Sequence, residues 1–312
     1  MAAALPEPTG RGGNPAAPAV SVIVVNWRRE EATVSCGLRV LAWEELSPAL
    51  FVVDNGSGAA VVARIASQLA GATVCASSSN LGFGGANNLV LDDIASEFVL
   101  LLNNDAEINE ESVTRLVRFL ENRPEAGVAG PVLESTAPQH HVIAAGGRNV
   151  LRYGRTHYSA AERAVELQAS QPYSVDYVPG TVALIRCGLL RRLGGFDEDY
   201  FFSGEMADLC ARAMDAGFGS FVVPTARAAH DLDQAGPLRA SLYPYYSLRN
   251  RFLFIRRHRH RTFWPSALWT ARGMLRWITS LATGRVALAR GLGLALVHGL
   301  RGRFGAAPGR LS

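Results

Sequence analysis

Four polar residues follow apolar runs in the first third of the chain: Asn26, Asp54, Asn80 and Asp105. Carboxylate and amide side chains of this kind can bind the polar groups of a ligand. In a sheet of parallel strands, ligands bind where the carboxyl ends of the strands meet. Turns also use Asn and Asp, so each residue taken alone fits a turn as well as a site. The four together favour a ligand-binding site.

The segments that must position these residues alternate between strand and helix patterns. Apolar runs typical of buried strands occupy residues 20–25, 49–53, 72–76 and 98–102. Helical spacing of apolar residues occurs over residues 30–42, 61–69 and 86–95, and in a helix that Asn109 can cap. This alternation predicts βαβ units, and therefore an α/β fold with a mostly parallel sheet flanked by helices.

The pattern becomes less regular farther along the chain. Residues 131–175 have few periodic runs, which predicts a hairpin or a loop over the site. Strand-like runs follow at residues 175–186 and 218–223. Between them, Ser203 is the expected N-cap of a helix that extends to about Ala216.

Composition excludes a globally disordered chain, because 48% of the 312 residues are hydrophobic and only 19% are charged. The net charge of +4 hides an asymmetry: residues 234–312 hold 14 arginines and no Asp or Glu. All 27 acidic residues lie before this segment. A basic segment rich in Trp, Leu and Phe predicts an anionic partner.

The four cysteines lie far apart without a C-x-x-C pair, which argues against a zinc site and a disulfide framework and fits a reducing compartment. Residues 1–19 are mostly Ala, Pro and Gly, so we expect a disordered leader there and no signal peptide. No uncharged apolar run reaches the ~18 residues that a membrane-spanning helix needs. The expected protein is soluble or peripheral to a membrane.

Six motifs resemble, in the same order, those of family-2 glycosyltransferases, and most closely the bacterial rhamnosyltransferase-like branch. They read SVIVVN (21–26), VVDNGS (52–57), NLGFGGAN (80–87), LLNND (101–105), LGGFDEDYFF (193–202) and EMADLC (205–210). The resemblance covers residues 20 to about 260. It implies a GT-A fold and transfer of a sugar from a nucleotide-diphosphate donor with inversion at the anomeric carbon.

The resemblance also implies which residues bind the donor. Asp54 would accept a hydrogen bond from the ring N–H of a pyrimidine, and the Gly-rich turn would let the backbone approach the donor closely. The remaining donor-binding candidates are Asn26, Asn80, Gly82, Gly84, Asn87 and Asn104. A Rossmann dehydrogenase is a rival interpretation of the Gly-rich turn, but Asn87 stands at the third glycine position and two βα units precede the turn.

The implied metal motif is incomplete. Where the family typically has Asp-x-Asp, this chain has Asn103-Asn104-Asp105. Asp105 keeps the key carboxylate, and Mg²⁺ commonly relies on one or two carboxylates plus phosphate. We therefore expect a divalent cofactor, Mg²⁺ or Mn²⁺, at Asp105.

Two basic residues are further candidates. His230, expected in a short loop beyond the strand that ends near residue 223, helps to bind metal or diphosphate in many relatives, and a structural role is an equal alternative. Arg249, or alternatively Arg251, would clamp a diphosphate bidentately. The competing interpretation for each arginine is an exposed basic helix face.

The position of the catalytic base is unusual. Relatives read Glu-Asp-x-Asp here and use the second residue to deprotonate the acceptor, whereas this chain has Met206, which cannot accept a proton. Either Glu205 or Asp208 replaces it, or the acceptor binds differently, or catalysis is lost. We favour Glu205, because a carboxylate in the first turn of a helix at the mouth of the sheet can meet an acceptor hydroxyl. The helix dipole alone also favours an acid there.

The C-terminal segment, residues 261–312, is predicted to be a basic amphipathic helical tail. Its apolar face consists of Trp264, Leu268, Ala271, Leu275, Ile278 and Ala282, with arginines 272 and 276 beside it. Such helices bind anionic membrane surfaces. The alternative is a helix that packs on the catalytic core. We expect no nucleic acid partner, because the tail has no known binding motif.

The sequence thus predicts a glycosyltransferase domain over residues 20–260. Its expected reaction is metal-dependent, inverting sugar transfer from a nucleotide-diphosphate sugar donor to a cell-envelope glycan or lipid-linked acceptor. The expected location is the cytoplasmic face of the cell membrane, with the protein bound peripherally. The alternative is a non-catalytic GT-A-like binding or scaffold protein, which the residues Asn103 and Met206 motivate.

Overall fold

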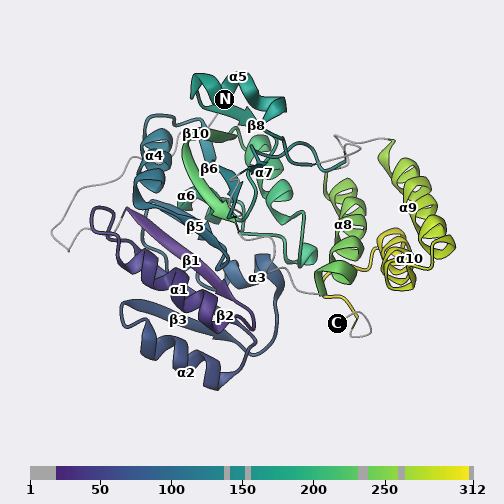
Figure 1. Cartoon of the computed structure of the whole chain (residues 1–312), viewed down its shortest axis with the longest axis horizontal. Coiled ribbons are helices and arrows are strands. Elements are labelled where there is room, and N and C mark those ends of the chain that lie inside the picture. Colours follow the sequence, from purple (N-terminus) through teal and green to yellow (C-terminus); the bar gives the residue numbers. More distant parts are fainter. Residues whose placement is uncertain (1–18, 137–140, 152–155, 231–237, 259–263, 309–312) are drawn as a thin grey trace.

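The computed structural model describes residues 19–136, 141–151, 156–230, 238–258 and 264–308 (Figure 1). The expected leader, residues 1–19, lies outside the described residues apart from Ala19.

The first half of the chain alternates strands and helices, with two differences from the prediction: the helix expected over residues 86–95 lies at 82–88, and an additional short strand, β5, follows β4 directly. In chain order its elements are β1 (Val20–Asn26), α1 (Glu30–Leu41), β2 (Ala49–Asn55), α2 (Ala59–Gln68), β3 (Ala72–Ser77), α3 (Gly82–Asn88), β4 (Phe98–Leu102), β5 (Ala106–Ile108) and α4 (Glu110–Glu121). The expected cap of α4 is confirmed, because the Asn109 side chain accepts a hydrogen bond from the N–H of Ser112.

The second half adds strands that connect less regularly. Its elements are β6 (Ala126–Ser135), β7 (Val142–Ala144), a 3₁₀ turn (Ala161–Arg163), α5 (Ala164–Ala169), β8 (Tyr173–Val175), β9 (Val182–Arg186), α6 (Cys187–Arg192), a second 3₁₀ turn (Glu198–Tyr200), α7 (Glu205–Asp215) and β10 (Gly219–His230). Residues 131–175 therefore contain the end of β6 and the short strands β7 and β8, together with α5.

One sheet runs through the molecule in the order β3-β2-β1-β4-β9-β6-β10-β5. The strands from β3 to β4 are parallel, and so are β6 and β10. Strand β9 runs antiparallel to both of its neighbours, β4 and β6, so the sheet is mixed. In the parallel part, Asn26 and Asp54 lie side by side at the ends of β1 and β2, as predicted.

Apolar side chains fill both faces of this sheet. In β1, Val20, Val22 and Val24 face the layer formed by α1, α2 and α4, whereas Ile23 faces the layer formed by α3, α6 and α7. Successive side chains of a strand point to opposite faces, so a continuous apolar run such as this one suits a strand that helices cover on both sides.

Strand β10 is longer than the sequence predicts. It continues past Pro224 to His230, with an irregular register against β6 between Val222 and Arg227. The prediction that the strand ends near residue 223 and that His230 follows in a loop is therefore wrong. Because the last residues of β10 also pair with β5, His230 lies directly opposite Ala106.

Three C-terminal helices stand beside the sheet (Figure 1): α8 (Leu238–Arg257), α9 (Pro265–Ala282) and α10 (Val286–Arg301). They share a separate apolar cluster that includes Tyr245, Phe252, Trp269 and Leu292. Within the described residues, we find no helix with the length and apolar character needed to cross a membrane.

Candidate active site

Asp54, at the end of β2, is the best-supported carboxylate of the expected donor site. It is completely buried, and both of its oxygens accept hydrogen bonds, Oδ1 from Asn26 Nδ2 at 2.6 Å and Oδ2 from the N–H of Ser57 at 2.8 Å. A hollow of about 510 Å³ opens beside it, lined by residues of the β2–α2 turn and the end of β3 that include Gly56, Ala59 and Ser77. The site thus pairs an oriented carboxylate with space for a ligand.

A polar network connects Asp54 with the segment after β4. Asn26 uses its Oδ1 to accept hydrogen bonds from Thr33 Oγ1 at 2.9 Å and from the N–H of Arg29 at 3.2 Å. Thr33 in turn accepts a hydrogen bond from Asn104 Nδ2 at 2.9 Å. The structure therefore brings together three of the expected residues, and it adds Thr33, whose position seven residues after Asn26 gave no signal in the sequence.

The Gly-rich turn has a different local role from the one expected. Gly82 has φ of +75°, and an added Cβ would lie 2.2 Å from the carbonyl oxygen of Phe201. A Cβ on Gly84 would lie 2.9 Å from Phe196. These two glycines therefore allow α3 to pack closely against Phe196 and Phe201.

The two asparagines of this turn also make internal contacts. Asn80 Oδ1 accepts hydrogen bonds from the N–H of Gly82 and from Asn55 Nδ2, at 2.8 and 2.9 Å. Asn87 is almost completely buried and donates through Nδ2 to the carbonyl of Phe83 at 2.8 Å. In this structure both side chains stabilise the start of α3.

Asp105 and His230 meet at the same edge of the sheet. His230 Nε2 lies 3.2 Å from Asp105 Oδ1, and Arg29 Nη1 lies 3.7 Å from Oδ2. Burial raises the pKa of Asp105, but the contacts with His230 and Arg29 outweigh it and leave the pKa below its ordinary value. The carboxyl is therefore ionised at neutral pH.

These two residues fit a divalent ion. Asp105 Oδ1 is a buried atom that makes no regular hydrogen bond to any described residue. Two ligand atoms on neighbouring positions of an octahedral ion lie about 3 Å apart when each bond is about 2.1 Å, close to the spacing seen here. The described residues include no group of three or more His, Cys, Asp or Glu side chains suited to a metal.

Glu205 is the first residue of α7 and is 8% exposed. Its Oε2 is buried and has no hydrogen-bond partner among the described residues. Burial, with a smaller effect of the nearby Asp208 charge, raises the pKa of Glu205 to about 7. The helix begins after Gly204, at φ of +101°, without a side-chain cap, so the prediction that Ser203 caps it is wrong.

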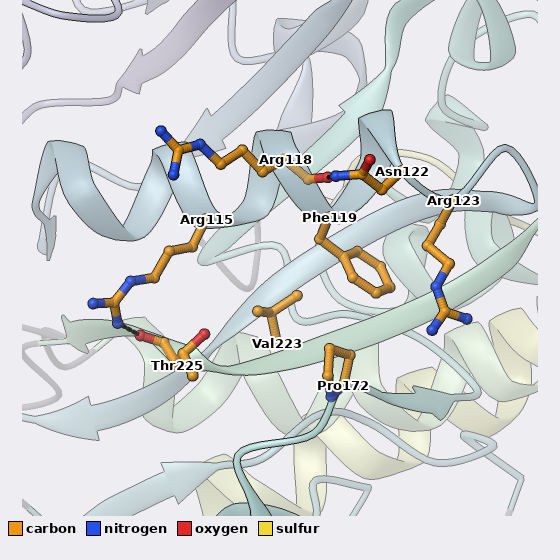
Figure 2. A pocket seen from close by; sticks show the side chains of 8 residues that line it. All are labelled: Arg115, Arg118, Phe119, Asn122, Arg123, Pro172, Val223 and Thr225. Atoms are coloured by element: carbon orange, nitrogen blue, oxygen red, sulfur yellow. Dashed lines mark hydrogen bonds between the residues drawn. The ribbon is translucent and has the colours of Figure 1, made fainter.

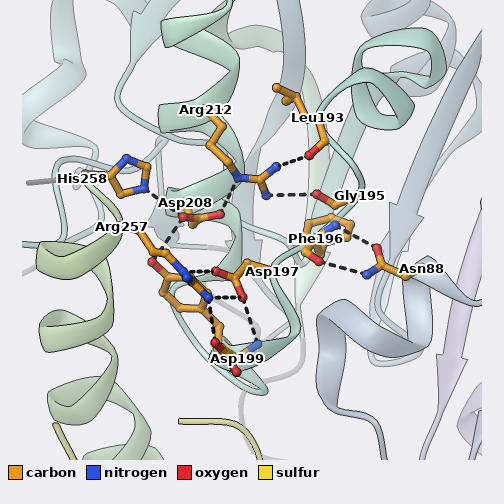
Figure 3. A network of polar contacts seen from close by, with 11 residues as sticks. Asn88, Leu193, Gly195, Phe196, Asp197, Asp199, Asp208, Arg212, Arg257 and His258 are labelled. Carbon is orange, nitrogen blue, oxygen red and sulfur yellow. Dashed lines mark hydrogen bonds and ion pairs between the residues drawn. The ribbon is translucent and has the colours of Figure 1, made fainter. Parts of the chain in front are cut away.

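Asp208 lies one turn farther along α7 and is fully engaged (Figure 3). Its carboxylate contacts Arg212 Nε at 2.7 Å and His258 Nε2 at 2.8 Å, and it accepts a hydrogen bond from the Tyr200 hydroxyl at 3.3 Å. Burial raises the pKa of Asp208, but His258 and Arg212 lower it by more. The pKa therefore lies below its ordinary value, and the carboxylate stays ionised. The structure favours a structural role for Asp208 over the expected catalytic one. Met206, the family's base position, is buried in the core.

Arg249 does not join these residues. It belongs to α8, and its completely buried side chain donates to the backbone carbonyls of Asp199 and Tyr200. A guanidinium in this position has no free face for a diphosphate. The expectation that Arg249 clamps the donor is therefore corrected, and the sequence had no means of revealing a partner about 50 residues away.

A second hollow, of about 340 Å³, lies along α4 and β10 and contains none of the residues described above (Figure 2). Its lining includes Arg115, Arg118 and Arg123, with Phe119 between them. Arg115 donates to the carbonyl of Thr225. No carboxyl group is among the described residues that line this hollow.

Residues 21–194, more than half of the chain, match the family described as Glycosyl transferase family 2. The chain is a member of this family. It is therefore a glycosyltransferase, and the family resemblance predicted from the motifs, including the rhamnosyltransferase-like branch, is confirmed.

Individual relatives agree with this assignment. The chain is 25% identical, over 72% of its length and 80% of the relative, to the N-acetylglucosaminyl-diphospho-decaprenol L-rhamnosyltransferase of Mycobacterium tuberculosis. It is 24% identical to Rhamnosyltransferase WbbL of Escherichia coli over 48% of this chain and 60% of the relative.

Solved structures confirm the GT-A fold. The structure of GalNAc-T7 with UDP, GalNAc and Mn²⁺ matches 76% of this chain and 48% of its own, with a TM-score of 0.61 and 15% identity. The mannosyltransferase PcManGT of Pyrobaculum calidifontis, in complex with GDP-Man and Mn²⁺, matches 91% of this chain and 87% of its own, with a TM-score of 0.56 and 16% identity.

Proposed function

We propose that this glycosyltransferase moves a sugar, with inversion, from a nucleoside-diphosphate donor to a cell-envelope glycan or lipid-linked acceptor at the cytoplasmic face of the membrane. The observation that carries the proposal is Glu205: a buried carboxyl at the start of a helix, with one oxygen unpartnered among the described residues. Direct displacement with inversion needs one general base and no covalent nucleophile, and Glu205 supplies that base.

The donor would lie along the edge formed by β1, β2 and the segment after β4. Asp54 would accept a hydrogen bond from the N–H of the nucleotide base in the neighbouring hollow that it lines. Asp105 and His230 would hold a divalent ion, Mg²⁺ or Mn²⁺, that neutralises charge on the diphosphate leaving group. Both structural neighbours named above contain Mn²⁺ with a nucleotide or nucleotide sugar, which supports a divalent ion as the cofactor.

The reaction then needs one proton acceptor. The acceptor hydroxyl oxygen attacks the anomeric carbon, the bond from that carbon to the phosphate oxygen breaks, and its electron pair stays with the diphosphate. The hydroxyl proton passes to Glu205. A base is most effective when its pKa lies near the working pH, and the pKa of about 7 at Glu205 meets this condition.

The C-terminal helices support peripheral binding to an anionic membrane. Leu268, Leu275 and Ile278 of α9 are exposed, with 45%, 62% and 52% of their surface open to solvent. The opposite face of α9, which includes Trp269, packs on the other helices. Exposed leucine and isoleucine beside arginines and without any acid suit an anionic leaflet. The mycobacterial relative is named for a decaprenol-linked substrate, which also supports a lipid-linked acceptor.

A donor-turnover assay tests the proposal. The full chain is incubated with UDP-, dTDP- and GDP-sugars and Mg²⁺ or Mn²⁺, with a membrane lipid extract as the source of acceptor, and released nucleotide is measured. We expect release from one donor class, dependent on the ion and lost in Glu205→Gln. Nucleotide binding without turnover would instead favour the non-catalytic alternative that Met206 and Asn103 suggested.

A further inference from the structure

Arg249 of α8 holds a stretch of backbone that leads to the active site. Its Nη2 donates to the carbonyl oxygens of Asp199 and Tyr200, at 2.9 and 3.0 Å. Its Nη1 donates to the carbonyl of Gly305, and its Nε to Asn250 Oδ1 at 2.8 Å. Among the described residues, the guanidinium thus donates its hydrogen bonds to carbonyl oxygens and to no carboxylate. These contacts fix the orientation of its planar fork.

Asn250 extends the same contact. Its Nδ2 lies 2.9 Å from the carbonyl oxygens of both Tyr200 and Phe202, and it also donates to the carbonyl of Ser203. The side chain is 4% exposed. The two neighbours therefore contact, between them, nearly every carbonyl of residues 199–203, the last part of the loop that joins α6 to α7 (the 193–204 loop).

The backbone they hold is strained. Phe201, Ser203 and Gly204 have φ of 59°, 71° and 101°, in the region that residues with side chains rarely adopt. Two of the three are not glycine. Such conformations persist only where the surrounding structure fixes them, and they gather at functional sites. The contacts from Arg249 and Asn250 provide that fixation.

The strained turn contacts the start of α3 on one side and leads into the start of α7 on the other. The carbonyl of Phe201 accepts a hydrogen bond from the N–H of Phe83, at 2.7 Å, in the first turn of α3. Gly82, the residue before it, leaves the space that Phe201 occupies. At the other end the turn leads through Gly204 directly into Glu205. The position of the turn therefore determines where the carboxyl lies relative to the Gly-rich start of α3.

We propose that Arg249 and Asn250 are positioning residues that hold the 193–204 loop so that Glu205 faces the donor across a fixed distance. The inference rests on the proposed role of Glu205 as the base. It also gives the C-terminal region a second role besides the proposed membrane binding, because residues of α8 and Gly305 make the contacts that hold the loop.

The test compares Asn250→Ala and Arg249→Lys with a matched control, Arg256→Ala. Arg256 lies on the same helix, donates to the carbonyl of Leu300 in α10 at 2.8 Å and lies 5.8 Å from the Phe304 ring, and it makes no hydrogen bond to a described residue of the loop. A lysine at position 249 keeps the charge, but one ammonium group cannot reproduce the fork of contacts. The readouts are kcat, the donor KM, the affinity for UDP, dTDP and GDP with Mn²⁺, and the thermal unfolding midpoint.

Well below the unfolding midpoint of each variant, we expect Asn250→Ala and Arg249→Lys to lower kcat by about 10- to 100-fold, the usual effect of misplacing a reacting group by about 1 Å. The affinity for the nucleotide changes less than about threefold, since Asp54 and Asp105 do not touch the loop. Arg256→Ala keeps kcat. Unchanged kcat in both loop variants, or an equal loss in Arg256→Ala, would overturn the inference.

Hydrogen exchange separates this inference from the proposed function. If the wild-type chain turns over no donor, the proposed function fails, but the loop can still be examined. We expect faster exchange in Asn250→Ala at the amides of Phe83 and Asp208, which bond to Phe201 and Gly204 respectively, and no change in Arg256→Ala. Unchanged exchange at these two amides would overturn the positioning role.

Discussion

Replacing Glu205 by Gln removes a charge and leaves the side-chain volume unchanged. In the native protein the pKa of this carboxyl is raised from 4.5 to about 7, chiefly by burial. A shift of that size corresponds to about 3 kcal/mol of preference for the neutral form, at 1.36 kcal/mol for each unit. The amide has no charge to desolvate, so the variant escapes this cost while losing the base.

The sign of the effect on stability follows from linkage. Below about pH 4.5 the carboxyl is protonated in both states, so the wild type and the variant should unfold with similar free energies. As the pH rises, the unfolded state releases its proton first, and the native wild type loses stability until the pH passes about 7. At about pH 8 we therefore expect Glu205→Gln to be more stable than the wild type by up to about 3 kcal/mol.

The activity of Glu205→Gln should fall although its stability rises. Loss of the general base should lower kcat by roughly 10²-fold or more, and the wild-type rate should rise with pH through about 7 as Glu205 ionises. Urea unfolding at about pH 5 and pH 8, together with initial rates across this range, measures both effects. Glu121→Gln, at the exposed end of α4, is the control and should alter neither. Full turnover in Glu205→Gln, or a stability difference that is equal at both pH values, would refute the reasoning.

Three further outcomes follow from other sites. Asp105→Asn should abolish the metal-dependent binding of UDP, dTDP and GDP in calorimetry, and an unchanged affinity would exclude Asp105 as a metal ligand. Asp208→Asn should lower the free energy of unfolding in urea by about 3–5 kcal/mol, because Arg212 loses its buried counter-charge, and a loss below about 1 kcal/mol would contradict this. Leu275→Asp should reduce cosedimentation with anionic vesicles while changing stability by less than about 0.5 kcal/mol, and equal sedimentation would reject α9 as the membrane-binding face.

The parts of the fold that depend on local pattern could be predicted from the sequence. The strands β1 to β4 follow from apolar runs, and the start of α4 follows from Asn109 because a cap uses neighbours three residues away. The adjacency of Asn26 and Asp54 followed from the rule that parallel strands end at one edge.

The failures have identifiable causes. The expected strand ends at residue 223, directly before Pro224, which cannot donate to the ladder, but an irregular register allows β10 to continue to His230. Ser203 has the preferred chemistry of a cap, yet the tertiary contacts from Asn250 place it at a positive φ, and Gly204 becomes the cap.

The partners of Asp208 show the remaining limit. Arg212 is at helical spacing and could be inferred, but His258 lies 50 residues away, directly after the end of α8. The same holds for Arg249, whose sequence context suggested a ligand and whose partners are backbone atoms. Backbone acceptors carry no sequence signature, so contacts of this kind become visible only in the folded chain.

The contact between Arg249 and Gly305 has a consequence for how the enzyme is made. The N–H of Gly305 donates to the carbonyl of Asp199, and its carbonyl accepts from Arg249, so this one residue joins both sides of the loop contact. A growing chain can build the sheet and the donor edge from its first 230 residues, but it cannot complete the support of the base until residue 305 has been synthesised. If Glu205 is the base, we expect a fragment that ends before residue 305 to bind nucleotide without transferring sugar.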